Sequence, residues 1–187
     1  SAVSEKALQL DPENKWLARA PRLRLSAESI RDQALAISGL LVRKIGGPSV
    51  KPYQPEGLWK ETTGGGGGST ANYVPDTGAS LYRKSMYTFW KRTVPPPSML
   101  TFDASNRDLC SVKSQQTNTP LQALVLLNDP QIIEASRVLA EKATKKETKV
   151  AAQLAYIYLA ATGQFTTEKV AEQLLALYHD MEQQVLE

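Results

Sequence analysis

The sequence has little of the material from which catalytic and cofactor sites are usually built. It contains one cysteine, Cys110, and one histidine, His179, among 187 residues. A single cysteine excludes an internal disulfide framework and a cysteine-rich zinc site, and no Cys-x-x-Cys-His run is present to attach haem. A single histidine excludes a multi-histidine metal centre. We therefore predict no metal site and no cofactor, with Cys110 as a buried, inert thiol and His179 as a surface or helix-end residue.

A large charge excess and long apolar runs are also missing. The chain has 22 basic and 19 acidic residues, and this net charge of +3 is too small to predict an electrostatically driven nucleic-acid binder. No apolar run reaches the roughly 18 residues that a membrane span requires, so we predict none. The glycines from Gly64 to Gly68 are followed by Ser69 and not by lysine, which excludes a P-loop for phosphates.

The composition, 42% hydrophobic and 22% charged, is typical of one globular domain. The first residues lack the features of a signal peptide, and the last ones fall within a helical pattern. We interpret residues 1–187 as a single α-helical domain cut from a longer protein. We expect a mobile glycine-rich loop at about residues 62–72, because glycine loses the most backbone entropy on ordering. The sequence leaves open whether these glycines are native or engineered.

Capping signals and apolar spacing predict helices in the first part of the chain. We expect a short helix from Ser4 to Leu10 and one or two helical turns from Pro12 to about Arg19. A longer helix should begin after the N-cap Ser26 and stop at Gly46-Gly47-Pro48. Its apolar face would be Ile30, Ala34, Ile37 and Leu41, and its opposite, polar face Arg31, Asp32 and Gln33. We predict an irregular conformation for residues 46–80. For residues 80–92 we favour a helix over a strand.

The last third of the chain predicts four further helices. Thr119 opens a capping box before a helix that runs to about Leu127, and Asp129-Pro130 caps the next one. A helix over Val150 to Thr162 should stop at Gly163, and the last should start at Thr166 or Thr167. The expected buried stripes are Ile132, Ala135, Leu139 and Ala143, and then Val170, Leu174, Leu177 and Met181. The predicted fold class is mainly α, a helical bundle with a long irregular Pro/Gly-rich segment wrapped over it.

The most unusual composition lies between Tyr82 and Lys113, where aromatic residues alternate with six basic and two acidic ones. Aromatic rings with cations can form a surface for sugars or an anionic polymer, and they can equally form a core with paired arginines. We take as candidate binding residues Tyr82, Trp90, Arg92, Asp103, Asn106 and Arg107. No catalytic residue is assigned, because Asp103 and Asp108 are as well explained as turn formers.

Five blocks of this sequence resemble one known family, the domain of unknown function 1553. The blocks are Arg24–Asp32, Gly46–Val50, Leu81–Pro97, Phe102–Arg107 and Gln116–Pro130. They occur in the same order and cover roughly residues 12–180.

The resemblance implies the C-terminal module of a large planctomycete-type protein. Such proteins usually carry a cytochrome c-like domain and a companion domain of unknown function 1549, are exported to the periplasm or cell exterior, and are suspected to serve polysaccharide breakdown. The family has no established activity. We expect a non-catalytic interaction module that docks onto companion domains or binds an anionic polysaccharide. The alternative is a carbohydrate-active enzyme with a cleft around Asp103, Arg107 and Asp108, beside Trp90.

Overall fold

The computed structural model describes residues 5–17, 24–62, 72–105 and 116–186, and every statement on the structure concerns these residues. The predicted glycine-rich loop lies almost entirely outside them. The helices in chain order are α1 (Glu5–Leu10), α2 (Ala27–Ser38), α3 (Leu58–Thr62), α4 (Pro97–Thr101), α5 (Pro120–Asn128), α6 (Pro130–Lys146), α7 (Val150–Thr162) and α8 (Glu168–Leu186). Two short 3-10 helices, η1 (Gly78–Tyr82) and η2 (Ser85–Tyr87), lie between α3 and α4. The mainly α prediction is confirmed.

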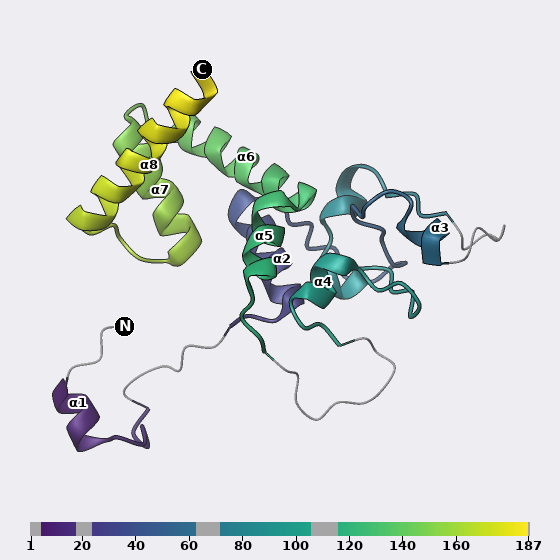
Figure 1. Cartoon of the computed structure of the whole chain (residues 1–187), viewed down its shortest axis with the longest axis horizontal. Coiled ribbons are helices and arrows are strands. Elements are labelled where there is room, and N and C mark those ends of the chain that lie inside the picture. The colour runs from purple at the N-terminus through teal and green to yellow at the C-terminus, as the bar shows by residue number, and fades with distance from the viewer. Residues whose placement is uncertain (1–4, 18–23, 63–71, 106–115, 187) are drawn as a thin grey trace.

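Helices α2 and α6 pack together at the centre of the fold. Helix α5 leads into α6, and α7 and α8 follow it (Figure 1). The N-cap of α2 is as predicted, with the Ser29 N–H donating to the Ser26 hydroxyl at 3.2 Å. The predicted end is wrong, because α2 stops at Ser38 and not at Gly46. Gly39 takes a left-handed conformation at φ 77°, which glycine adopts without strain, and the Lys142 ammonium fills the space of a β-carbon there.

The buried face of α2 differs from the predicted one. It consists of Ala27, Arg31, Leu35 and Ser38. Ile30, Ala34 and Ile37 are only partly buried. The prediction that Arg31 lies on an outer polar face is wrong, because this side chain is buried among polar acceptors that an apolar pattern does not reveal.

Arg31 joins three parts of the chain through its guanidinium group. It donates to the carbonyl oxygens of Leu81 at 2.8 Å and Arg83 at 2.9 Å, to the Ser85 hydroxyl at 3.1 Å and to Gln131 Oε1 at 2.5 Å. The amide of Gln131 also donates to the Leu81 carbonyl, at 2.9 Å. Burial lowers the pKa of Arg31, an effect that the neighbouring Asp32 opposes. An arginine nevertheless stays protonated, so α2, α6 and residues 81–85 are held together by a buried charge.

We call residues 40–62 and 72–96 the strap, because they run as an irregular segment over α2 and α6. The helix predicted at residues 80–92 is wrong. The Val50 N–H donates to the Tyr87 carbonyl at 2.8 Å, and the Phe89 N–H to the Val50 carbonyl at 2.7 Å. These backbone groups therefore bond to distant residues and not within a helix. The regular structure of residues 80–92 is limited to parts of η1 and η2 and to isolated β-bridges.

Two side chains fix the strap further. Arg83 donates to the carbonyl oxygens of Pro48 at 2.8 Å and Lys44 at 3.2 Å, and to that of Gly46. Trp59 is 4% exposed, with the Tyr73 ring centroid 4.9 Å from its own. The wrapped, irregular segment predicted from the sequence is thus ordered by a buried arginine and an aromatic pair.

The N-terminal segment agrees with the sequence only in part. The short first helix is confirmed as α1, but the helical turns expected from Pro12 are wrong in the described part. The Asp11 carboxylate instead accepts the N–H groups of Lys15 and Trp16, each at 2.8 Å. Asn14 and Leu17 have positive φ values of 54° and 53°, which a helix does not allow.

The caps of the C-terminal helices are confirmed. The Thr119 N–H donates to Gln122 Oε1 at 3.3 Å in the predicted capping box of α5. Asp129 caps α6 by accepting from the Gln131 N–H at 2.9 Å. Gly163 ends α7 at φ 70°. The buried stripe of α6 is confirmed for Ala135, Leu139 and Ala143, and Ile132 is partly buried.

The predicted buried stripe of α8 is wrong in its second half. Val170 and Leu174 are partly buried, whereas Leu177 is 58% and Met181 53% exposed. The reason is that α8 packs mainly on α7 among the described helices, at the end of an arm of three consecutive helices (Figure 1). Within the described residues, none of the helices combines the length and apolar character that crossing a bilayer requires.

We predict that Arg31→Ala lowers the free energy of unfolding by about 3 kcal/mol or more, because it leaves several buried acceptors without a donor. Urea unfolding followed by circular dichroism measures this change. The control is Arg137→Ala, at an exposed residue whose partner is Glu141, and it should cost at most about 1 kcal/mol. Equal losses for the two variants would contradict the role assigned to Arg31.

Candidate functional site

The structure places the candidate binding residues Tyr82, Trp90 and Arg92 in different surroundings. The Tyr82 hydroxyl donates to Glu134 Oε1 at 2.8 Å, and this hydrogen bond raises the pKa of Tyr82. Trp90 packs against a small core cluster that contains Phe102. Arg92 is exposed. Trp90 therefore serves the core in the described structure, while Arg92 presents its side chain to solvent.

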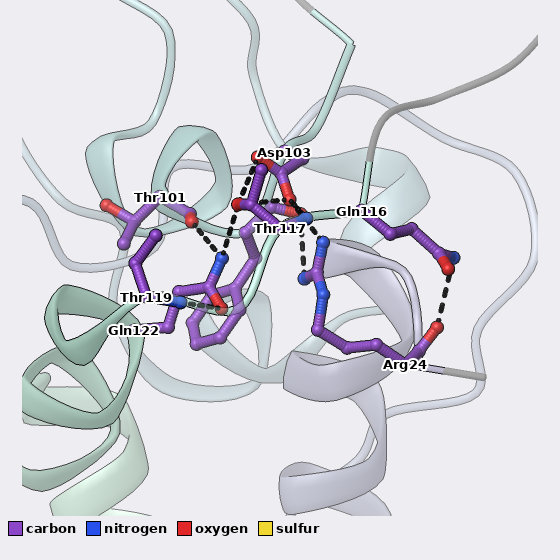
Figure 2. Close-up of polar contacts among 8 residues, drawn as sticks. Arg24, Thr101, Asp103, Gln116, Thr117, Thr119 and Gln122 are labelled. Atoms are coloured by element: carbon purple, nitrogen blue, oxygen red, sulfur yellow. Dashed lines mark hydrogen bonds and ion pairs between the residues drawn. The ribbon is translucent and has the colours of Figure 1, made fainter. Parts of the chain in front are cut away.

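Asp103 is the centre of a polar cluster between α2, α4 and α5 (Figure 2). It follows α4 in a left-handed conformation at φ 58°. The Thr117 N–H donates to its carboxylate at 2.8 Å, and the Thr117 hydroxyl lies 3.0 Å from each carboxylate oxygen. Arg24 forms an ion pair with the same carboxylate and donates to the Phe102 carbonyl at 3.1 Å. The donors on Thr117 and Arg24 thus occupy the carboxylate of Asp103.

Two glutamines extend this cluster, as Figure 2 shows. Gln122 in α5 donates to the Thr101 carbonyl at 2.9 Å and to the Thr117 hydroxyl at 3.2 Å. Gln116 donates to the Arg24 carbonyl at 3.1 Å. The cluster therefore joins the end of α4 to the start of α5, and it sets which side of α5 faces outward.

The electrostatics of Asp103 follow from these contacts. The Thr117 N–H has the largest effect and lowers the pKa of the Asp103 carboxyl. Desolvation opposes it, and the Thr117 hydroxyl and Arg24 lower the pKa further, so the net pKa is below the usual value. Asp103 is therefore ionised at neutral pH, when it can accept protons or hydrogen bonds but cannot act as a general acid.

Most of the remaining candidates lie outside the described residues. Asn106, Arg107, Asp108 and Cys110 lie outside the described residues. His179 is on the exposed side of α8, with its Nδ1 3.5 Å from Glu182 Oε2. Among the described residues, no three His, Cys, Asp or Glu side chains gather as a metal site would require.

The largest feature that the sequence reasoning missed is an apolar surface on α5. We define the leucine face as Leu121, Leu124 and Leu127, which are 56%, 56% and 74% exposed. In α5 only Gln122 is buried. Neither α4 nor α5 contains a charged residue. Leu100 of α4 and Ile133 of α6, the helices before and after α5 in the chain, are also exposed, at 40% and 51%.

A cavity of about 650 Å³ opens beside the leucine face. It lies between α4, α5 and the strap, and its wall combines apolar side chains with a few polar ones. Its principal lining residues are Tyr53, Pro55, Pro97, Leu124 and Val125. The leucine face and this cavity together form an exposed apolar region with a hollow beside it.

Residues 1–178 match the family PSD1, described as a protein of unknown function (DUF1553). The chain belongs to the PSD1 family. The resemblance inferred from the five sequence blocks is thereby confirmed. Comparison with curated proteins finds no match, and comparison with solved structures finds none either.

One signal in this PSD1 chain could have revealed the leucine face. The sequence of α5, PLQALVLLN, is apolar on nearly every side, and a helix of that kind is normally buried all round. The capping box predicts where α5 begins, but it does not indicate which residues cover the helix.

We predict that Asp103→Asn lowers the stability of this PSD1 domain in a pH-dependent way. The folded pKa of Asp103 lies below the unfolded value of about 4, so its contribution is full above that pH and is lost as the pH falls through the folded pKa. Asparagine tolerates the positive φ. Urea unfolding should therefore show a stability difference between the parent sequence and the variant at neutral pH that shrinks at acidic pH, as the pH falls through the folded pKa of Asp103. The same difference at both pH values would be evidence against this assignment.

Proposed function

We propose that this PSD1 chain is a non-catalytic interaction module whose leucine face docks onto companion domains of a longer protein. The observation that carries the proposal is an uncharged helix, α5, with three leucines more than half exposed beside a cavity. Contiguous exposed apolar surface is a mark of interaction sites. Permanent interfaces are also more apolar than transient ones, so an uncharged apolar surface of this kind suits a lasting contact.

The energetics support this kind of contact. Full burial of a leucine side chain contributes about 1.5–3 kcal/mol, so covering the leucine face would give a substantial driving force without any charged contact. The cavity between Tyr53, Pro97 and Val125 would receive a side chain of the companion domain. The Asp103 cluster serves this surface, because it holds α5 against α4 in a fixed orientation.

The alternative function, a carbohydrate-active enzyme around Asp103, Arg107 and Asp108, has less support. Asp103 is held by Thr117 and Arg24 and is ionised at neutral pH, so it does not provide the proton donor that glycoside hydrolysis needs. Trp90 belongs to the core cluster. No observation on the described residues favours an enzyme over an interaction module.

We extend the proposal to the setting of the longer protein. The family resemblance supports a planctomycete-type exported protein, periplasmic or extracellular, that associates with an anionic polysaccharide. The exposure of Arg92, one of the candidate binding residues, supports this part of the proposal, because an anionic glycan would need an accessible cation.

We predict that the double variant Leu124→Gln, Leu127→Gln weakens binding to the companion domains at least tenfold, which corresponds to about 1.4 kcal/mol. Isothermal titration of the chain against separately produced companion domains measures this. The matched control is Ile45→Gln, Val74→Gln, at residues 85% and 68% exposed elsewhere in the chain, and it should bind normally. A folded double variant that binds like the parent sequence would refute the docking surface.

A glycan array tests the polysaccharide part separately. We expect the chain to bind acidic glycans and the variant Arg92→Ala to lose most of the signal, because the exposed cation would no longer meet an anionic group. Arg137→Ala, an exposed arginine on α6, serves as the control. Absence of binding by the folded chain would remove the polysaccharide part and leave the docking proposal in place.

A further inference from the structure

The cavity beside the leucine face carries one charge. It lies between Tyr53 of the strap, Pro97 of α4 and Leu124 of α5, and Asp129 is the only acidic or basic residue among the described residues that line it. Asp129 separates α5 from α6 and is partly buried. Covering a carboxylate that has no partner for its charge is costly. This charge therefore limits which group of a docking partner can enter the cavity.

The two oxygens of the Asp129 carboxylate have different roles. Oδ1 accepts the N–H groups of Gln131 at 2.9 Å and Ile132 at 3.3 Å, and so caps the start of α6. Oδ2 accepts no hydrogen bond from the described residues, and Asp129 forms no ion pair with any of them. The buried Arg31 attracts this carboxylate from a distance, but its hydrogen bonds go to other acceptors. One carboxylate oxygen is therefore left for a donor from outside the domain.

Further acceptors lie beside Asp129. Asn128 also lines the cavity, and its amide nitrogen donates to the Leu124 carbonyl at 2.8 Å, which leaves Asn128 Oδ1 without a hydrogen bond from the described residues. The carbonyl groups at the C-terminal end of a helix carry a partial negative charge. Helix α5 ends at Asn128 and has no basic residue in its last turn. This end of the cavity therefore presents acceptors and negative charge, which suits a cation.

A basic side chain fits this cavity better than a metal ion does. Hard metal ions bind six or more oxygen ligands, and no three His, Cys, Asp or Glu side chains gather in the described part of the chain. Lysine and arginine instead carry their cation on an apolar stem, which packs well on apolar walls such as Leu124 and Val125. The ring of Tyr53, which is 36% exposed, offers the cation a further contact.

We infer that the cavity receives a lysine or arginine side chain of the companion domain. The stem of this side chain packs against Leu124 and Val125, and its cation donates hydrogen bonds to Asp129 Oδ2 and Asn128 Oδ1. This inference rests on the docking function proposed above and adds the origin of its specificity. The leucine face supplies apolar burial, whereas Asp129 selects a partner that presents a basic side chain within an apolar surface.

The variant Asp129→Asn tests the inference without removing the cap of α6, because asparagine caps a helix as well as aspartate does. Isothermal titration against separately produced companion domains should show binding weakened at least fivefold. The affinity of the parent sequence should fall with added salt, and the variant should lose most of this salt dependence. The matched control is Asp180→Asn, at an exposed residue of α8, which should bind normally. Circular dichroism verifies that both variants are folded.

The variant Leu124→Gln, Leu127→Gln, measured alongside, separates this inference from the docking proposal. If the leucine variant binds weakly and Asp129→Asn binds like the parent sequence, the inference is overturned and the docking proposal stands. If the leucine variant binds like the parent sequence, both are refuted. Weaker binding by both variants, with normal binding by Asp180→Asn, is the result that the inference predicts.

A double-mutant cycle identifies the basic side chain. Each exposed lysine and arginine of the companion domain is replaced in turn by methionine, which keeps an apolar stem and removes the charge. One replacement should weaken binding to the parent sequence at least fivefold. The same replacement should weaken binding to Asp129→Asn much less, because the charge pair is already broken in that variant. If no replacement distinguishes the parent sequence from Asp129→Asn, the inferred contact is wrong.

Discussion

The fold depends on the guanidinium group of Arg31, a buried charge whose hydrogen bonds reach three parts of the chain. Burying an unpaired charge costs several kcal/mol, so the chain is stable only if the donors of Arg31 are matched by acceptors. The matching acceptors come from η1, η2 and α6, which are far apart in sequence. The arrangement of α2, α6 and the strap is therefore specified by polar geometry as much as by apolar burial.

The candidate docking surface is a consequence of this arrangement. With the strap fixed over α2 and α6, the chain continues through α4 into the Asp103 cluster, where Thr117, Arg24 and Gln122 set the start of α5. The one buried residue of α5, Gln122, is polar and points into that cluster. The leucines consequently face outward. An apolar helix that uses its polar residue for anchoring and exposes its leucines is what an interaction module requires.

The sequence predicted the features that depend on local chemistry. Helix caps such as Ser26, Asp129 and Gly163 were found because a side-chain acceptor or a left-handed glycine acts within a few residues. Features set by distant contacts were missed. Arg31 was assigned to the exposed face because it is polar. The periodicity of apolar residues does not reveal that residues 81–85 supply buried acceptors for it. Residues 80–92 of the strap were predicted to form a helix, because Val50, to which their backbone groups bond, lies far away in the sequence.

The same limit applies to the site. The stretch rich in aromatic and basic residues suggested a binding surface, yet Arg83 and Trp90 in it contribute to the strap and the core. The exposed apolar surfaces were missed because an apolar pattern predicts burial and does not say that the covering partner lies outside the domain.

The central claim is that the leucine face is covered in the longer protein. Hydroxyl-radical footprinting of the peptide from Leu121 to Leu127 tests it most directly, in the isolated chain and in the intact longer protein. The account predicts strong labelling in the isolated chain and marked protection in the longer protein, with the exposed Ile45 labelled equally in both. Equal labelling of the leucines in both would contradict the account.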